Sequence, residues 1–156
     1  TVSTPQKAEL SRRAGAVEVL DYPDDPQEFG RRIKEMTDGG VAVVYDGVGA
    51  ATFEASLASL RVRGVLALFG ASSGPVPPFD PQRLNAAGSL FLTRPTLVHY
   101  TRTPDEFAWR AGELLDAIGN GTLSVTVSNR YRLADAAQAH RDLHARKTVG
   151  SVVLIP

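Results

Sequence analysis

The sequence contains no cysteine, no excess of either charge and no long apolar run. Without cysteine, the 156 residues can form no disulfide, no thiolate zinc site and no cysteine nucleophile. The 17 basic and 17 acidic side chains balance, which argues against a nucleic-acid-binding surface. No apolar run is long enough to cross a membrane, and the first residues do not resemble a signal peptide. We therefore expect a soluble, cytoplasmic protein.

The chain alternates between helical and strand periodicity. Helices are expected over 5–16, 25–40, 51–60, 103–121 and 134–146, and strands over 17–22, 41–46, 64–70, 88–94, 126–133 and 150–156. The helix over 103–121 begins with Thr103, Pro104 and Glu106, which is the pattern of a capping box. The runs 41–46 and 64–70 are continuously apolar, which is typical of strands buried on both faces.

This alternation of strands and helices predicts an α/β fold with a doubly wound parallel sheet and helices on both faces. Such sheets bind ligands at the carboxyl ends of their strands. The loops that follow the predicted strands are therefore the first places to look for a site.

A glycine pair, Gly47 and Gly49, follows the strand over 41–46. A dinucleotide fingerprint needs a third small residue, but that position holds Thr52, and no carboxylate follows about twenty residues later. The pattern favours a tight strand-to-helix turn over a pyrophosphate site. The chain thus has the strands of a nucleotide-binding fold without its phosphate loop.

No side chain in the sequence demands a catalytic acid–base role. His140 and His144 are four residues apart on a predicted helix, but they lack the glutamate of a zinc-protease motif, and neither His99 nor any other residue is an evident third ligand. We expect solvated histidines and no metal. Asp46, at the end of a strand, is expected to cap the turn that follows it.

Five stretches of the sequence resemble the zinc-independent quinone oxidoreductases of the medium-chain dehydrogenase/reductase superfamily. They are AGAVEVLDY, VVYDGVG, LRVRGVLALFGASSG, GSLFLTRPTL and ARKTVGSVVLIP, and they cover the chain in order. The resemblance implies an incomplete Rossmann-like domain over 1–156, together with the terminal helix and strand of the cofactor cleft. The first βα unit, the glycine fingerprint and the family's N-terminal domain have no counterpart here, so we expect the chain alone to be inactive.

The resemblance also implies a cofactor, NADPH, and the residues that contact it. Ser3, Thr4, Lys7 and Tyr22 match positions around the adenosine 2′-phosphate, and Val2 stands where relatives that use NAD usually carry an aspartate. Positions elsewhere match further cofactor contacts: Val48, Phe69, Ser72, Ser73, Gly74, Pro95, Thr96, Leu97 and Arg146. No catalytic residue is implied, because the nicotinamide performs the hydride transfer.

Two functional interpretations follow. The first is the C-terminal part of an NADPH-dependent quinone oxidoreductase that reduces a quinone or enone. The second is a non-catalytic nucleotide-fold module that serves in dimer assembly or binding; a crotonyl reductase or alcohol dehydrogenase branch also remains open. The apolar strand over 88–94 carries no guarding charge before Arg94, so we expect a homodimer through this edge.

Overall fold

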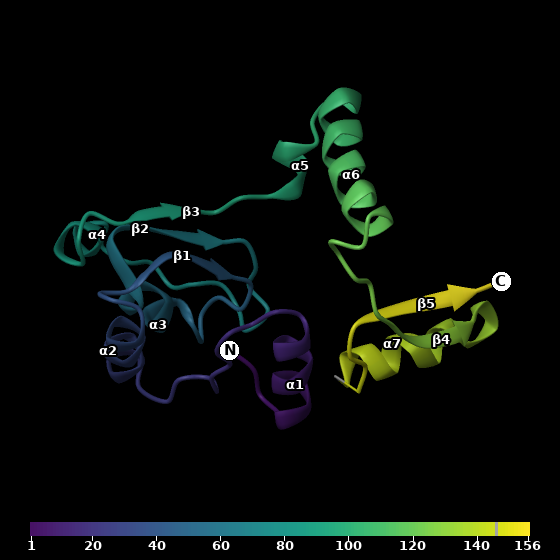
Figure 1. The fold of residues 1–156 in the computed structure, drawn as a ribbon, viewed down its shortest axis with the longest axis horizontal. Helices are drawn as coiled ribbons and strands as arrows, with labels where there is room; N and C mark the ends of the chain where they lie inside the picture. Colours follow the sequence, from purple (N-terminus) through teal and green to yellow (C-terminus); the bar gives the residue numbers. More distant parts are fainter. Residues whose placement is uncertain (146) are drawn as a thin grey trace. The chain divides into compact units, whose positions relative to one another are not determined.

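The computed structural model describes residues 1–145 and 147–156, and its chain divides into two compact units, Thr1–His99 and Tyr100–Pro156. Figure 1 labels the helices and strands of both units. In the described residues, no helix is both long and apolar enough to span a bilayer.

Unit 1 is built on three parallel strands, β1 (Val41–Asp46), β2 (Leu60–Leu68) and β3 (Phe91–Thr93), in the order β1-β2-β3 (Figure 1). The register pairs Asp46 with Leu68 and Ala67 with Thr93. Two helices pack on the sheet, α2 (Pro26–Met36) and α3 (Phe53–Ala58). The predicted parallel α/β fold is confirmed.

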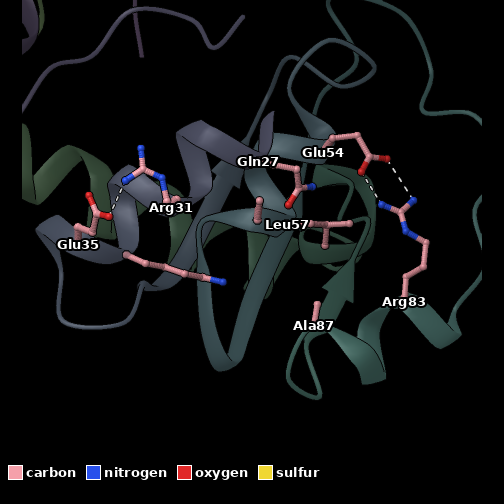
Figure 2. Close-up of a pocket in the computed structure, with 9 residues that line it drawn as sticks. Gln27, Arg31, Glu35, Glu54, Leu57, Arg83 and Ala87 are labelled. Atoms are coloured by element: carbon pink, nitrogen blue, oxygen red, sulfur yellow. Dashed lines mark hydrogen bonds and ion pairs between the residues drawn. The ribbon is translucent and has the colours of Figure 1, made fainter. Parts of the chain in front are cut away.

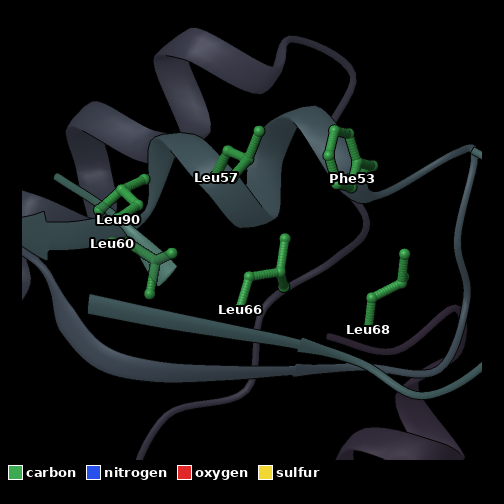
Figure 3. Packing of buried hydrophobic residues seen from close by; sticks show 6 residues of the cluster. All are labelled: Phe53, Leu57, Leu60, Leu66, Leu68 and Leu90. Atoms are coloured by element: carbon green, nitrogen blue, oxygen red, sulfur yellow. The ribbon is translucent and has the colours of Figure 1, made fainter. Parts of the chain in front are cut away.

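The core of unit 1 lies between α3 and one face of the sheet. Phe53 and Leu57 point from α3 toward Leu66 and Leu68 of β2, as Figure 3 shows. Leu66 is fully buried, and Leu60 and Leu90 complete the cluster. Because side chains alternate along a strand, this cluster uses only one face of β2.

The opposite face of the sheet differs from the expectation of strands buried on both faces. Val43, Tyr45 and Phe91 are 40%, 77% and 61% exposed. The prediction of double burial for 41–46 was wrong, because α2 and α3 pack against the other face of β1 and β2. The continuously apolar sequence of β1 therefore did not reveal whether one or both faces of the sheet are buried at this strand.

Residues 17–22 also differ from expectation, because they form no strand. Only Asp21 pairs, through an isolated parallel bridge to Val2, and Val17 is 93% exposed. A strand exists only where a neighbour accepts its backbone hydrogen bonds, and here a single pair of residues supplies that neighbour.

Three further helices belong to the first hundred residues. They are α1 (Pro5–Arg13), α4 (Gln82–Ala86) and α5 (Leu97–Tyr100). The hydroxyl of Thr4 caps α1 by accepting from the Lys7 N–H at 3.3 Å, and proline occupies the first turn, as predicted.

Unit 2 contains one long helix and a short parallel βαβ unit. The long helix is α6 (Pro104–Gly119), whose predicted capping box between Thr103 and Glu106 is confirmed. The βαβ unit comprises β4 (Val127–Arg132), the 3₁₀ turn η1 (Leu133–Asp135), α7 (Ala136–His144) and β5 (Ser151–Ile155). The Tyr131 hydroxyl donates to Asp142 at 2.9 Å and ties β4 to α7.

Candidate functional site

Three loops leave the carboxyl ends of neighbouring strands in unit 1. Loop A (47–52) follows β1, loop B (69–74) follows β2, and loop C (94–97) follows β3. Because the strands are parallel and paired up to Asp46–Leu68 and Ala67–Thr93, the loops begin side by side at one edge. This edge is where parallel α/β sheets bind ligands. It brings together eight predicted site residues: Val48, Phe69, Ser72, Ser73, Gly74, Pro95, Thr96 and Leu97.

Asp46 is the buried centre of loop A. Its Oδ1 accepts from the backbone N–H groups of Val48 and Gly49 at 2.8 and 3.0 Å. The Thr52 hydroxyl lies 2.9 and 2.8 Å from the two carboxylate oxygens, and the Ser56 hydroxyl donates to Oδ2 at 2.7 Å. Asp46 is only 4% exposed. The expected role of Asp46 as a cap of this turn is therefore confirmed.

The same bonds decide what the glycine turn can do. In a phosphate loop, backbone N–H groups point at the ligand. Here the N–H groups of Val48 and Gly49 are already bonded to a carboxylate of the chain itself. The turn therefore offers these two donors to no pyrophosphate, which agrees with the interpretation as a tight strand-to-helix turn.

The pKa of Asp46 reflects two opposing effects. Burial favours the neutral acid and would raise the pKa, but hydrogen bonds from Gly49, Ser56, Val48 and Thr52 favour the carboxylate. The hydrogen bonds prevail together, and the pKa lies below its ordinary value. Asp46 is thus a charged acceptor at neutral pH, and a poor candidate for a catalytic base.

Loop B is bonded directly to loop A through Ser73. The Ser73 hydroxyl donates to the Val48 carbonyl at 2.7 Å and accepts from the Ala51 N–H at 3.0 Å. The Ser73 N–H also donates to the Val48 carbonyl, at 2.8 Å. Ser73, predicted as a cofactor contact, therefore has its hydroxyl bonded to loop A, although Ser73 and the neighbouring Ser72 are both exposed residues.

Loop C carries the remaining predicted contacts of this edge. The Arg94 guanidinium donates to the Pro95 carbonyl at 3.1 Å, and the His99 N–H donates to the Thr96 carbonyl at 3.1 Å. Leu97 is 74% exposed, although it is an apolar side chain. An exposed apolar side chain beside a ligand-binding edge is available for contact with an apolar part of a ligand.

Four other predicted residues gather at the start of the chain. Val2 and Asp21 form a parallel bridge, in which the Val2 N–H donates a hydrogen bond to the Leu20 carbonyl at 2.9 Å. This bridge brings Ser3 and Thr4 beside Tyr22. Lys7 is half-buried in the first turn of α1, where helix N–H groups and an ammonium favour an anion.

Tyr22 also helps to line a pocket that carries four carboxylates and one guanidinium, that of Arg32. Its carboxylates are those of Asp21, Asp24, Asp25 and Glu28. This excess of negative charge disfavours a phosphate there, and Lys7 is the attractive position at the start of the chain. Arg146, the last predicted contact, lies outside the described residues.

A pocket of about 570 Å³ lies elsewhere in unit 1. It is lined by residues of α2 and α3, by Arg83 of α4 and by Ala87 just after α4 (Figure 2). Its charged side chains are largely paired: Arg31 with Glu35 at 2.6 Å, and Arg83 with Glu54. None of its lining residues belongs to loops A, B or C. We therefore place the candidate site at the loops rather than in this pocket.

Metal binding finds no support in the part of the chain that the structure describes. No three acidic or histidine side chains gather there as a ligand set, and His99, His140 and His144 are exposed.

Sequence reasoning missed two residues of the site. Thr52 was used only to reject a fingerprint, and Ser56 was not considered, yet both donate to Asp46. The signal was their spacing. Residues four apart lie on the same face of a helix, so two hydroxyls in the first turn of α3 indicate a shared buried partner.

The fold and the loop cluster are those of a nucleotide-binding α/β protein. Residues 14–154 match the family model described as zinc-binding dehydrogenase, and the chain belongs to this family.

Named relatives agree with the predicted quinone oxidoreductase resemblance. The chain is 45% identical, over its whole length, to a quinone oxidoreductase of Pseudomonas aeruginosa, and 40% identical to a 2-haloacrylate reductase of a Burkholderia species. It spans 48% and 47% of these two proteins, about half the length of each.

Among solved structures, a mycobacterial protein complexed with NADPH is 66% identical and superposes with a TM-score of 0.93. The match covers 99% of this chain and 47% of the mycobacterial one. The predicted Rossmann-like fold is confirmed by this likeness.

Proposed function

We propose that the chain is the C-terminal part of an NADPH-dependent quinone oxidoreductase, which transfers hydride from NADPH to a quinone or enone. The observation that carries the proposal is the set of three neighbouring loops at the carboxyl edge of the sheet, which holds eight of the predicted contacts. The relatives named quinone oxidoreductase and the relative solved with NADPH support the same reaction class. The 2-haloacrylate reductase keeps activated alkenes within the acceptor class.

The chain's own residues would bind and orient the cofactor. Loops A, B and C would border its nicotinamide half, and Ser3, Thr4, Lys7 and Tyr22 would hold the adenosine 2′-phosphate. When bound, NADPH supplies the hydride, and the protein supplies position and electrostatics. No described side chain is needed as an acid or base.

Quinone turnover by the chain alone is not expected. The glycine turn of loop A has its two N–H donors bonded to Asp46, so it cannot cradle the pyrophosphate. The alternative function is a non-catalytic nucleotide-fold module that serves in dimer assembly or binding. A module that serves only in assembly would bind neither NADPH nor NADH, so cofactor titration separates it from the first proposal.

The test is the substitution Lys7→Ala, measured by calorimetric titration with NADPH and NADH, and with adenosine 2′,5′-bisphosphate and AMP as smaller probes. A charge-assisted contact contributes about 1.5–3 kcal/mol, so affinity for the two 2′-phosphorylated ligands should fall about 10- to 100-fold. Affinity for NADH and AMP should not change, because neither carries that phosphate.

Lys34→Ala is the matched control. Lys34 lies on α2 in the charged pocket, away from the start of the chain, so its removal should alter no affinity. Equal losses for NADPH and NADH in Lys7→Ala would refute the assignment of Lys7. If the wild-type chain binds neither NADPH nor adenosine 2′,5′-bisphosphate, Ser3, Thr4, Lys7 and Tyr22 do not form a phosphate site by themselves.

Assembly through the edge of the sheet is a second part of the proposal. β3 is the last strand in the order of unit 1, and its Phe91 is 61% exposed. Pairing of this strand with its copy in a second subunit would cover both its backbone groups and Phe91. We propose a homodimer joined over 88–94.

A further inference from the structure

The two loops that follow β1 and β2 interlock with no room between them. A Cβ added to Gly70 would lie 2.3 Å from the Gly47 carbonyl oxygen, and one added to Gly49 would lie 2.6 Å from the Gly74 carbonyl oxygen. Both glycines therefore permit a backbone approach that no other residue allows. Loops A and B can hold this arrangement only if something fixes the conformation of each.

Asp46 is the group that fixes loop A. It accepts two backbone N–H groups from within the loop and two hydroxyls from the start of the loop's helix, all at 2.7–3.0 Å. The carboxylate accepts from N–H groups of the turn, as an anionic ligand does in a phosphate loop. An internal anion thus holds the turn in one shape without a ligand.

Loop B depends on the shape of loop A. The two groups to which the Ser73 hydroxyl is bonded, the Val48 carbonyl and the Ala51 N–H, lie on either side of the Gly49 bend. The Ala50 N–H also donates to the Gly74 carbonyl, at 3.1 Å. If the bend at Gly49 changed, the Val48 carbonyl and the Ala51 N–H could no longer both bond to the Ser73 hydroxyl. Loss of order in loop A would therefore also release loop B.

We propose that Asp46 is a positioning residue for the cofactor, because its carboxylate locks loop A and, through Ser73, loop B in one arrangement. The inference rests on the proposed function for the identity of the ligand. Asp46 is 4% exposed and all its bonds point into the protein, so it acts on the cofactor only through the residues that it holds. Ser73 belongs to the same lock, and Ser72 is the serine left to face the ligand.

The experiment compares Asp46→Ala, Asp46→Asn and Ser73→Ala with the wild-type chain, using amide hydrogen exchange without ligand and NADPH titration. In Asp46→Ala, exchange of the Val48, Gly49 and Ala51 amides should accelerate at least tenfold, and NADPH affinity should fall by a similar factor. Added formate, a carboxylate small enough for the space vacated, should reverse both changes. Asp46→Asn keeps an acceptor for the N–H groups of Val48 and Gly49, so its exchange rates and NADPH affinity should lie between those of the wild-type chain and those of Asp46→Ala.

Asp25→Ala is the matched control. Asp25 also accepts two backbone N–H groups, at 2.7 and 3.1 Å, but caps α2 away from both loops. Its removal should lower stability while leaving exchange in loops A and B unchanged, and formate should have no effect on that exchange. If Asp46→Ala does not fold, Ser73→Ala carries the test: exchange at Ala51 should rise several-fold, and Ser73→Thr should restore it.

Unchanged exchange in loops A and B after removal of Asp46 would overturn the inference. So would faster exchange with unaltered NADPH affinity, because the lock would then serve only stability. If the wild-type chain does not retain NADPH, the proposed function fails for this chain, and the exchange data alone then support or overturn the lock.

Discussion

Gly30 should resist the replacement that usually stabilises a helix. In an exposed helix interior, exchanging glycine for alanine gains about 1 kcal/mol. Gly30 is buried where α2 meets α3, and an added Cβ would lie 2.4 Å from the Ala58 Cβ and 2.7 Å from the Ala58 carbonyl carbon and oxygen. Overpacking typically costs about 1–3 kcal/mol, and two of these contacts are with backbone that cannot rotate away.

We therefore expect Gly30→Ala to lower the free energy of unfolding of unit 1 by about 1 kcal/mol net, which is a fall of several tenths of 1 M up to about 1 M in the urea midpoint. Unfolding should be followed through the amide resonances of β1 and β2, because the only tryptophan, Trp109, reports on unit 2. The second substitution Ala58→Gly should restore part of the loss, since it removes the methyl contact but leaves the carbonyl contacts.

The control is Gly112→Ala in α6. Apart from Gly112 itself, its two chain neighbours and the backbone of its own helix, no described atom lies within 4 Å of the Cβ that this change would add. Here the helix propensity acts alone, and unit 2 should gain up to about 1 kcal/mol. Equal stabilisation by Gly30→Ala and Gly112→Ala would show that α2 and α3 do not approach as closely as described.

Two further predictions concern Asp46 and β3. Because the folded pKa of Asp46 is lowered, its charge stabilises unit 1 fully above the unfolded pKa of about 4, and this contribution is lost as the pH falls through the lower folded pKa. In urea titrations between pH 6 and pH 2.5, the free energy of unfolding of unit 1 should therefore fall less in Asp46→Asn than in the wild-type chain. An equal fall in both proteins would show that other groups cause the loss of stability in acid. Phe91→Lys should convert a dimer into a monomer in sedimentation velocity, whereas Val17→Lys, at a site 93% exposed, should leave the assembly intact. A Phe91→Lys protein that stays dimeric would place the interface away from β3.

The sequence was most informative where local chemistry acts alone. The capping box at Thr103 and Glu106 and the capped turn after Asp46 follow from neighbours within a few residues, and the structure contains both. The strand over 41–46 was also placed correctly, because an apolar β-branched run has few alternatives. These features need no knowledge of what packs against them.

Features that depend on distant partners were harder to predict. Residues 17–22 have a strand-like composition but form only one bridge, and the exposed face of β1 shows that apolar character does not reveal burial. The lock between loops A and B joins residues more than twenty positions apart through Ser73. No periodicity within either loop could have indicated that bond.

In loop A, the presence of a glycine motif and the ability to bind a phosphate are separate properties, because the Asp46 carboxylate already accepts from the N–H groups of the turn. Completing the fingerprint with Thr52→Gly would satisfy a pattern search, yet the Asp46 carboxylate would still occupy the two N–H groups. Such a variant would also lose a hydroxyl that donates to that carboxylate. To build a nucleotide-binding loop at this position, Asp46 would have to be replaced first. Only then would the N–H groups of Val48 and Gly49 be free to donate to a phosphate.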